Sequence, residues 1–330
     1  MKTKHKKLLI TPILAFCTFT FPFHTSHAEE KLSEHPQEWM SKVDSSKHLS
    51  QLNIPGTHDS GSFTLEDPVK AVWGKTQHLD YTNQMNQGVR FFDIRGRATS
   101  NQSIGIHHDL IYLHHQMGKF LNDAHQFLQE HPNETIIMSI KKDYGNAPDA
   151  TNPFEQIFRE NYFDSAQFGD YFYKGDKANP TLADTKGKIV VFNRMGNTST
   201  SAGYGTQAGG IQWPDNKTFD TTIQPGNLNL HVQDEYKDYY DAKKTAVINL
   251  INKAKEDTSE QSIYINFLSV SSGGTAFNSP YAYASYMNPD IAKYIKEQQP
   301  SRVGWIITDF SGYKWSGYDD INEQVIDSNK

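Results

Sequence analysis

The chain has 330 residues, of which 36% are hydrophobic and 12% aromatic, enough to build a sizeable core in one large domain or two average ones. Its formal net charge is −6. An acidic chain is ill suited to nucleic acid and to simple electrostatic adhesion to anionic membranes. The only cysteine, Cys17, lies near the N-terminus, which excludes disulfides, thiol catalysis and thiolate metal sites from the rest of the chain.

Residues 1–28 have the pattern of a secretory signal peptide. Four lysines precede an apolar stretch, Leu8–Phe23, and Ser26–Ala28 resembles a cleavage site. The apolar stretch is short and interrupted by proline, which argues against a retained membrane span. We expect a secreted, extracellular protein in which residues 29–330 form a single domain. Removal of the four lysines leaves 28 basic and 38 acidic side chains, a net charge of −10.

Strands and helices alternate along the chain. Eight segments rich in β-branched and aliphatic residues predict short strands: Gln51–His58, Arg90–Arg95, Ile104–His108, Thr135–Lys141, Lys188–Arg194, Leu228–Asp234, Ile263–Val270 and Val303–Asp309. Helical patterns lie between several of them: Phe120–His131, Phe154–Phe158, Tyr236–Ala254, and a helix that we expect to begin at Asn288-Pro289.

This alternation indicates parallel pairing, and eight such strands indicate an α/β fold of the irregular (β/α)8 TIM barrel type. The spacing from Arg95 to Ile104 is too short for a crossover helix, so we expect the irregularity there. Residues 198–219, rich in Gly, Ser and Thr, are expected to form a long loop.

The stretch Ile54–Gly61 ends an apolar strand in a turn that carries His58 and Asp59. Adjacent side chains on such a turn point in different directions, so we expect each to serve a separate partner across a cleft. Taken alone, a His-Asp pair in a polar loop is more often solvated surface. Other predicted strands also end in ionisable or ring-bearing residues: Asp93, Arg95, His107, His108, Lys141, Arg194, Asp234, Tyr236 and Asp309. Because the C-terminal ends of barrel strands share one face, these residues predict one site.

The residue types in this predicted site suit phosphoryl transfer. Two imidazoles supply a general base and a general acid, carboxylates orient them, and arginine and lysine bind the phosphate. No glycine-rich loop leads into Lys-Ser/Thr, so a nucleoside triphosphate is not indicated. An arginine in the site would repel a divalent cation, and we expect no metal and no cofactor. His114, His115 and Asp109 leave a metal site open as an alternative.

Several stretches resemble bacterial phosphatidylinositol-specific phospholipases C of the secreted staphylococcal and bacillary type. They are Ile54–Gly61, Phe91–Arg97, Val232–Asp234 with Tyr236, Ser271–Ala276, and Val303–Trp305 leading to Asp309. The resemblance covers nearly all of the chain after the signal peptide, and it implies an irregular (β/α)8 barrel. It also implies release of diacylglycerol and inositol 1,2-cyclic phosphate from phosphatidylinositol, with glycosyl-phosphatidylinositol anchors as a further substrate.

The resemblance assigns roles to the residues that match. His58 would be the general base, held by Asp309, and His108 the general acid, assisted by Asp59. Arg95 would bind the phosphate where metal-dependent relatives place calcium. Asp93, Lys141, Arg194 and Asp234 would contact the substrate, and Tyr236 would stack on the inositol ring. The chain departs from the family at Asp109, because the family usually has glycine directly after the histidine that corresponds to His108. We expect its carboxylate to favour the protonated form of His108.

The expected partner is a phosphatidylinositol membrane. Trp73 and Phe277 are predicted rim residues, because aromatic side chains favour the interface, although core packing is the alternative for Trp73. The tyrosines Tyr281, Tyr283 and Tyr286 suit choline headgroups by cation–π contact. We expect a monomer in solution and no nucleic-acid partner. Two rival interpretations are a metal-dependent glycerophosphodiester phosphodiesterase and a non-catalytic module that binds inositol phospholipid.

Overall fold

A computed structural model describes residues 30–196, 203–205, 210–237, 239–270, 275 and 277–330. The predicted signal peptide, residues 1–28, lies outside the described residues and stays a prediction, as does most of the matched stretch at 271–276. Residues 31–330 form one unit by their internal contacts.

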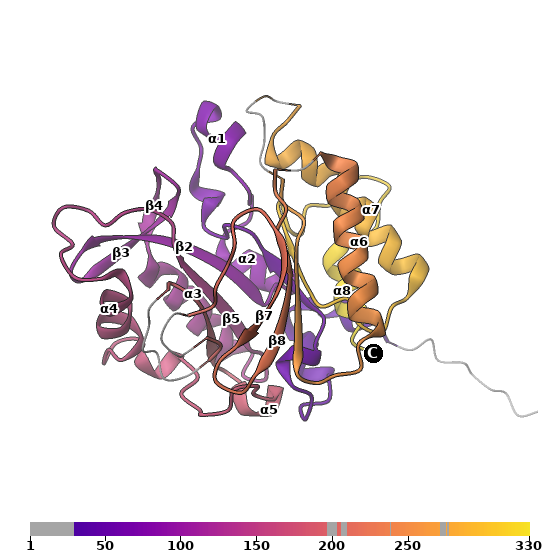
Figure 1. The fold of residues 1–330 in the computed structure, drawn as a ribbon, viewed down its shortest axis with the longest axis horizontal. Coiled ribbons are helices and arrows are strands. Elements are labelled where there is room, and N and C mark those ends of the chain that lie inside the picture. Colours follow the sequence, from indigo (N-terminus) through magenta and orange to yellow (C-terminus); the bar gives the residue numbers. More distant parts are fainter. Residues whose placement is uncertain (1–29, 197–202, 206–209, 238, 271–274, 276) are drawn as a thin grey trace, which may run out of the picture. The chain divides into compact units, whose positions relative to one another are not determined.

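A curved sheet of parallel strands forms the centre of this unit (Figure 1). In spatial order the parallel strands among the described residues are β6 (Ile189–Arg194), β5 (Ile136–Lys142), β2 (Phe91–Ser100), β1 (Ile54–Thr57), β10 (Trp305–Thr308), β9 (Ser262–Phe267) and β8 (Leu228–Gln233). An antiparallel strand, β7 (Thr218–Ile223), pairs with β8. Within the described residues no ladder joins β6 to β7 or β8, so the sheet is open at that seam.

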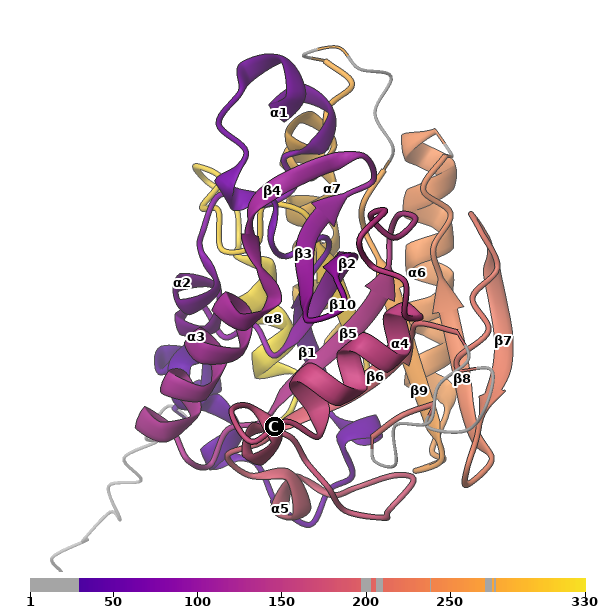
Figure 2. The ribbon, with the colours of Figure 1, turned by 90° about the vertical axis from the view of Figure 1, so that its left-hand side faces the viewer.

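One of the eight predicted strands pairs differently from the expectation. Residues Ser103–His108 form β3, but β3 runs antiparallel to β2, and β4 (Ile111–Gln116) completes a meander beside it (Figure 2). The reason is that β2 continues to Ser100, so only two residues separate it from β3. So short a connection permits a hairpin and no parallel crossover. The irregularity therefore lies where the spacing from Arg95 to Ile104 predicted it.

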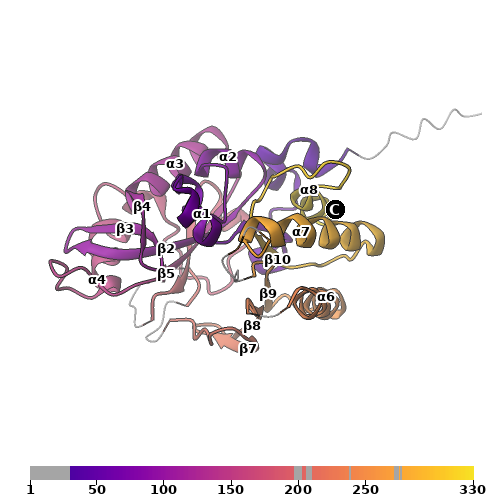
Figure 3. The ribbon, with the colours of Figure 1, turned by 90° about the horizontal axis from the view of Figure 1, so that it is seen from above.

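Helices cover the outside of the curved sheet (Figure 3). The α-helices of the described residues are α1 (Pro68–Gly74), α2 (Tyr81–Asn86), α3 (Met117–Glu130), α4 (Phe154–Phe158), α5 (Leu182–Thr185), α6 (Tyr240–Glu256), α7 (Pro280–Gln298) and α8 (Ile321–Asp327). A π turn, Arg159–Phe163, follows α4, and short 3-10 turns occupy Leu32–Glu34, Pro36–Lys42, Leu49–Gln51, Ser62–Thr64 and Gly169–Tyr171.

The predicted start of α7 was wrong. The helix begins at Pro280, capped by the Ser279 hydroxyl, which accepts a hydrogen bond from the Ala282 amide. Asn288 and Pro289 lie inside it and are buried. An Asn-Pro pair can stand at the start of a helix or inside one, and the local sequence does not distinguish the two positions. Here the side-chain amide of Asn288 does not cap a helix; it donates to the Asp309 carbonyl at 2.8 Å.

Aromatic side chains fill the space that the sheet encloses. Phe91 on β2 lies 5.7 Å from Trp305 on β10, and Phe192 on β6 lies 5.9 Å from the same indole, both measured between ring centres. These strands are not neighbours in the sheet, so the contacts require it to curl around them. In the motif Ile54–Gly61, a β-carbon on Gly56 would lie 2.4 Å from the Ile307 side chain, which explains why glycine stands there.

Candidate active site

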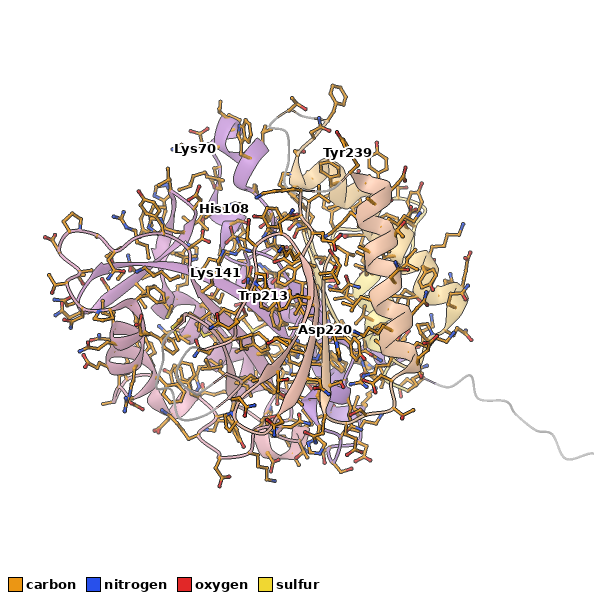
Figure 4. All side chains as sticks on the ribbon, in the orientation of Figure 1. Lys70, His108, Lys141, Trp213, Asp220 and Tyr239 are labelled. Atoms are coloured by element: carbon orange, nitrogen blue, oxygen red, sulfur yellow. The ribbon has the colours of Figure 1, made fainter. Side chains whose placement is uncertain are left out.

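A cavity of about 880 Å³ lies among residues that follow the C-terminal ends of the parallel strands. Most of the predicted site residues line it: His58, Arg95, His108, Lys141, Arg194, Asp234, Tyr236 and Asp309, together with the predicted rim residue Trp73. Three residues of its lining, His108, Lys141 and Trp213, are labelled in Figure 4. His107 does not line it; its ring is buried against Tyr112.

His58 and Asp309 meet because their strands are parallel neighbours in register. Thr57 on β1 pairs with Thr308 on β10, so the next residue of each chain segment emerges at the same height. His58 Nδ1 lies 2.7 Å from Asp309 Oδ1, and Asp309 is buried. The buried Gln77 amide ties the two strand ends together, since it donates to the carbonyls of His58 and Thr308 at 2.9 and 2.8 Å.

His108 pairs with Asp59 instead. Its Nδ1 lies 2.7 Å from Asp59 Oδ2 and 2.9 Å from the Gly74 carbonyl. Burial by itself would lower the pKa of His108, but the negative charge of Asp59 outweighs burial and raises the pKa to about 9. His108 is therefore protonated at neutral pH. The expectation that His58 and Asp59 serve separate partners agrees with these contacts.

The cavity carries a cluster of positive charge. Arg95 Nε donates to Asp93 Oδ2 at 2.8 Å, and Lys141 Nζ lies 3.2 Å from Asp143 Oδ1. Burial works against the charge of Arg95, but the carboxylates of Asp93 and Asp143 raise its pKa, so it stays protonated. The neighbouring charge of Arg95, together with burial, lowers the pKa of Lys141. Cations held this close together favour an anionic ligand.

Asp93, predicted as a substrate ligand, is fully buried and does not line the cavity. It contacts Arg95 on one side and Arg194 Nη1, at 3.3 Å, on the other. Burial alone would raise the pKa of Asp93, but the two arginines hold it well below its usual range. Asp93 therefore orients Arg95 and Arg194 from behind the cavity wall and does not itself face the ligand space.

Asp143 and Trp213 are among the lining residues that the sequence analysis did not identify. Asp143 lies 3.8 Å from Arg95 Nη1, accepts a hydrogen bond from the Asp109 amide, and is nearly buried. Its signal was available, because it follows Lys141 by two residues at the end of β5. Trp213 lies in an irregular segment within the predicted loop at 198–219 and had no comparable signal; part of that loop lies outside the described residues.

Asp109 differs from its expected role. Its carboxylate is exposed, and its backbone has φ of +51°, the left-handed conformation that favours glycine. The neighbouring carboxylates that raise the pKa of His108 are Asp59 and Asp143. The alternative metal site at Asp109, His114 and His115 also has no support, since the described residues contain no group of three or more His, Cys, Asp or Glu side chains arranged to hold a metal.

The two predicted rim residues are both exposed, which argues against core packing. Trp73 on α1 is 53% exposed and Phe277, just before α7, is 90% exposed. Helix α1 stands at the top edge in Figure 1. Tyr281 contacts Tyr313 and Trp315 in an aromatic cluster, and Tyr286 is exposed.

The fold and the cavity define the class first: an α/β barrel whose strand ends present two carboxylate-paired histidines and a cluster of cations. Comparison with known proteins then gives the family. The X domain of phosphatidylinositol-specific phospholipase C matches residues 52–195. A 1-phosphatidylinositol phosphodiesterase of Staphylococcus aureus (strain Newman) is 59% identical over 308 residues, which cover 93% of this chain and 99% of that protein. The corresponding protein of Listeria monocytogenes is 28% identical over 92% of each chain.

Solved structures agree with this assignment. A crystal structure of the phosphatidylinositol-specific phospholipase C from Staphylococcus aureus has a TM-score of 0.90 and 59% identity, covering 91% of this chain and all of that chain. The Listeria monocytogenes enzyme, at 23% identity and a TM-score of 0.68, shares the fold. The chain belongs to the phosphatidylinositol-specific phospholipase C family, and the predicted irregular TIM-barrel fold is confirmed.

Proposed function

We propose that the protein is a phosphatidylinositol diacylglycerol-lyase that cleaves phosphatidylinositol without a metal ion. The observation that carries the proposal is the pair of histidines, each with its own carboxylate, facing the same cavity as Arg95. The names of the Staphylococcus aureus relatives, which are 57–59% identical over nearly the whole chain, support the substrate.

In the proposed reaction His58 removes the proton from the inositol 2-hydroxyl, and Asp309 stabilises the imidazolium that forms. The freed oxygen attacks phosphorus, and the bond between phosphorus and the diacylglycerol oxygen breaks. His108 donates its proton to that leaving oxygen. The products are inositol 1,2-cyclic phosphate and diacylglycerol. Because the nucleophile belongs to the substrate itself, the step is intramolecular and gains the rate advantage of fixed proximity.

Arg95 and Lys141 stabilise the charge that develops on the phosphate oxygens. Arginine can contact two such oxygens at once and stays charged at any working pH. The high pKa of Arg95, maintained by Asp93 and Asp143, suits this role. Arg194, Asp234 and Tyr236 line the same cavity and are the proposed contacts for the inositol hydroxyls and ring. Asp93 acts behind them by holding the two arginines.

The finer partners are also proposals. We expect glycosyl-phosphatidylinositol anchors to be a second substrate. We expect the protein to dock on membranes through Trp73 and Phe277 and to bind choline headgroups through its exposed tyrosines. In solution we expect a monomer. The signal-peptide pattern supports secretion. None of the described helices is long and apolar enough to cross a bilayer.

Turnover of phosphatidylinositol in vesicles, measured with EDTA present, tests the proposal. We expect release of inositol 1,2-cyclic phosphate at the same rate with and without the chelator. A metal-dependent phosphodiesterase would lose its activity in EDTA and regain it with calcium. A non-catalytic module would bind the vesicles without releasing product. Either result would overturn the proposed function.

A further inference from the structure

Trp213 contacts two proposed inositol-binding residues of opposite charge. The guanidinium carbon of Arg194 lies 3.7 Å from the centre of the indole ring, a cation–π contact. The indole Nε1–H donates to Asp234 Oδ2 at 2.9 Å. All three residues line the cavity, and Trp213 is labelled in Figure 4. One side chain thus engages the cation with its face and the anion with its edge.

This arrangement keeps the two charges from pairing with each other. The ion pair that Arg194 makes among the described residues is with the buried Asp93, and Asp234 takes the indole proton. Asp234 is nevertheless close enough for its charge to act on Arg194. A direct bidentate pair between an arginine and a carboxylate would use the donors and acceptors that a ligand needs.

Arg194 retains unused hydrogen-bonding capacity at this site. Its side chain is 4% exposed, and its Nε is buried without a hydrogen-bond partner among the described residues. A guanidinium has five N–H donors, and the ion pair with Asp93 is made through Nη1. Asp234 accepts the indole proton on Oδ2 alone, and a carboxylate can accept further hydrogen bonds. A donor and an acceptor held side by side match neighbouring hydroxyl groups, each of which donates and accepts.

Two aromatic side chains pack against the indole in this position. Its ring packs edge-to-face on Phe219 at 5.4 Å and on Phe267 at 5.9 Å between centres. The segment that carries it is tied to the opposite strand as well, because the Asp234 amide donates to the Lys217 carbonyl and the Tyr236 hydroxyl donates to Asp215. The same short segment therefore supports both Asp234 and Tyr236.

We infer that Trp213 is a positioning residue that makes the site selective for a cyclic polyol headgroup, by holding Arg194 and Asp234 apart and aimed at adjacent ring hydroxyls. The inference rests on the proposed function and names the residue that sets its headgroup selectivity. Trp213 acts here through Arg194 and Asp234, so its loss should weaken inositol binding more than it slows the chemical step.

The test uses Trp213→Phe, which keeps an aromatic face for Arg194 and loses the proton given to Asp234, and Trp213→Leu, which loses both. The probe is free myo-inositol, with binding measured by calorimetry and as competitive inhibition of inositol 1,2-cyclic phosphate hydrolysis. We expect the dissociation constant to rise about 10-fold for Trp213→Phe, the scale of one hydrogen bond to a charged group, and further for Trp213→Leu. The kcat at saturating substrate should change much less.

Trp39→Phe is the matched control. Trp39 is fully buried and donates its indole proton to the Gly88 carbonyl at 3.0 Å, away from the cavity, so the variant loses an indole hydrogen bond without touching the site. It should lower the melting temperature and leave myo-inositol affinity unchanged. Unchanged affinity in both Trp213 variants would overturn the inference, as would a fall in kcat with affinity intact. If the wild-type chain hydrolyses neither phosphatidylinositol nor the cyclic phosphate, the proposed function fails instead.

Discussion

Asp59 lies beside His108 and not beside His58, its neighbour in the chain. Its Oδ2 is 2.7 Å from His108 Nδ1, while His58 Nδ1 is 2.7 Å from Asp309 Oδ1. One turn thus carries both His58, the proposed general base, and Asp59, the partner of the proposed general acid His108. Asp59 can do this because its backbone adopts a left-handed conformation, with φ of +42°. The two proton-transfer groups are therefore fixed relative to each other by a single turn.

The first prediction concerns the two histidines. His58→Ala and His108→Ala should each lower kcat by roughly 10²–10⁴-fold, because each removes one proton-transfer group. His125 on α3, which stacks on Tyr171 outside the cavity, is a suitable control, and His125→Ala should retain activity. Circular dichroism should show all three variants folded. Near-wild-type turnover in either cavity variant would remove that histidine from the mechanism.

The pH dependence of the acid should follow Asp59. His108 must be protonated to donate, so kcat/KM should fall on the alkaline side as the pH passes through about 9. Asp59→Asn removes the charge that raises this pKa, so the alkaline limb should move to lower pH. Asp143→Asn, a weaker influence on the same pKa, should shift it less. Equal limbs in wild type and Asp59→Asn would contradict the assignment.

The same pair should contribute to stability in a defined pH range. The folded-state pKa of His108, about 9, lies above its ordinary value of 6.5. The contribution is therefore fully present below about pH 6.5 and is lost as the pH rises through about 9. Urea unfolding at several pH values should show wild type losing more stability than Asp59→Asn across this window. A constant difference between the two proteins would count against the linkage.

Substitutions of Asp109 can separate the effect of its carboxylate charge from the effect of its left-handed backbone conformation. Its exposed carboxylate should have little effect on His108, so Asp109→Gly should leave the alkaline limb of the kcat/KM profile where it is. Asp109→Ala separates the two properties, because it removes the charge and keeps a β-carbon in the left-handed conformation. A downward shift in both variants would show that the Asp109 carboxylate does tune the acid. A shift in the glycine variant alone would indicate a backbone effect.

Membrane docking should depend on the exposed aromatic residues at the rim. Trp73→Ala/Phe277→Ala should bind phosphatidylinositol vesicles more weakly, because two exposed side chains are available to enter the interface. Hydrolysis of soluble inositol 1,2-cyclic phosphate should be nearly unchanged. Sedimentation with vesicles and a soluble assay separate the two effects. Unaltered vesicle affinity would place the docking surface elsewhere.

Local sequence patterns predicted most of the strands and the residues at their ends. Apolar runs such as Thr135–Lys141 identify strands because both faces are buried, and parallel pairing then brings the strand ends together. The pairing of Ser103–His108 was not predictable from its own composition, since hairpin and barrel strands use the same residues. Only the short connection after Arg95 hinted at it.

The start of α7 and the place of Trp213 were missed because both depend on tertiary contacts. Asn288 and Pro289 have the sequence pattern of a helix start, but both lie inside α7, where the side-chain amide of Asn288 donates to the Asp309 carbonyl. Trp213 lies in a segment with no periodic pattern, so its place between Arg194 and Asp234 follows only from the packing of Phe219 and Phe267 around it. Residues that act by filling space between others leave little trace in local sequence.

The open seam beside β6 has a consequence for backbone dynamics. With no strand ladder to β7 or β8 in the described residues, β6 is contacted on this edge by Tyr204 and Ile211: the Asn193 amide donates to the Tyr204 carbonyl at 3.0 Å, and the Ile211 amide donates to the Asn193 carbonyl at 3.0 Å. Amide hydrogens there can exchange with solvent when these contacts alone break, without unfolding of the sheet. The Asn193 amide should therefore exchange faster than amides on β5, which has strands on both sides. A bound inositol ring, by engaging the Trp213 side of this seam, should slow that exchange.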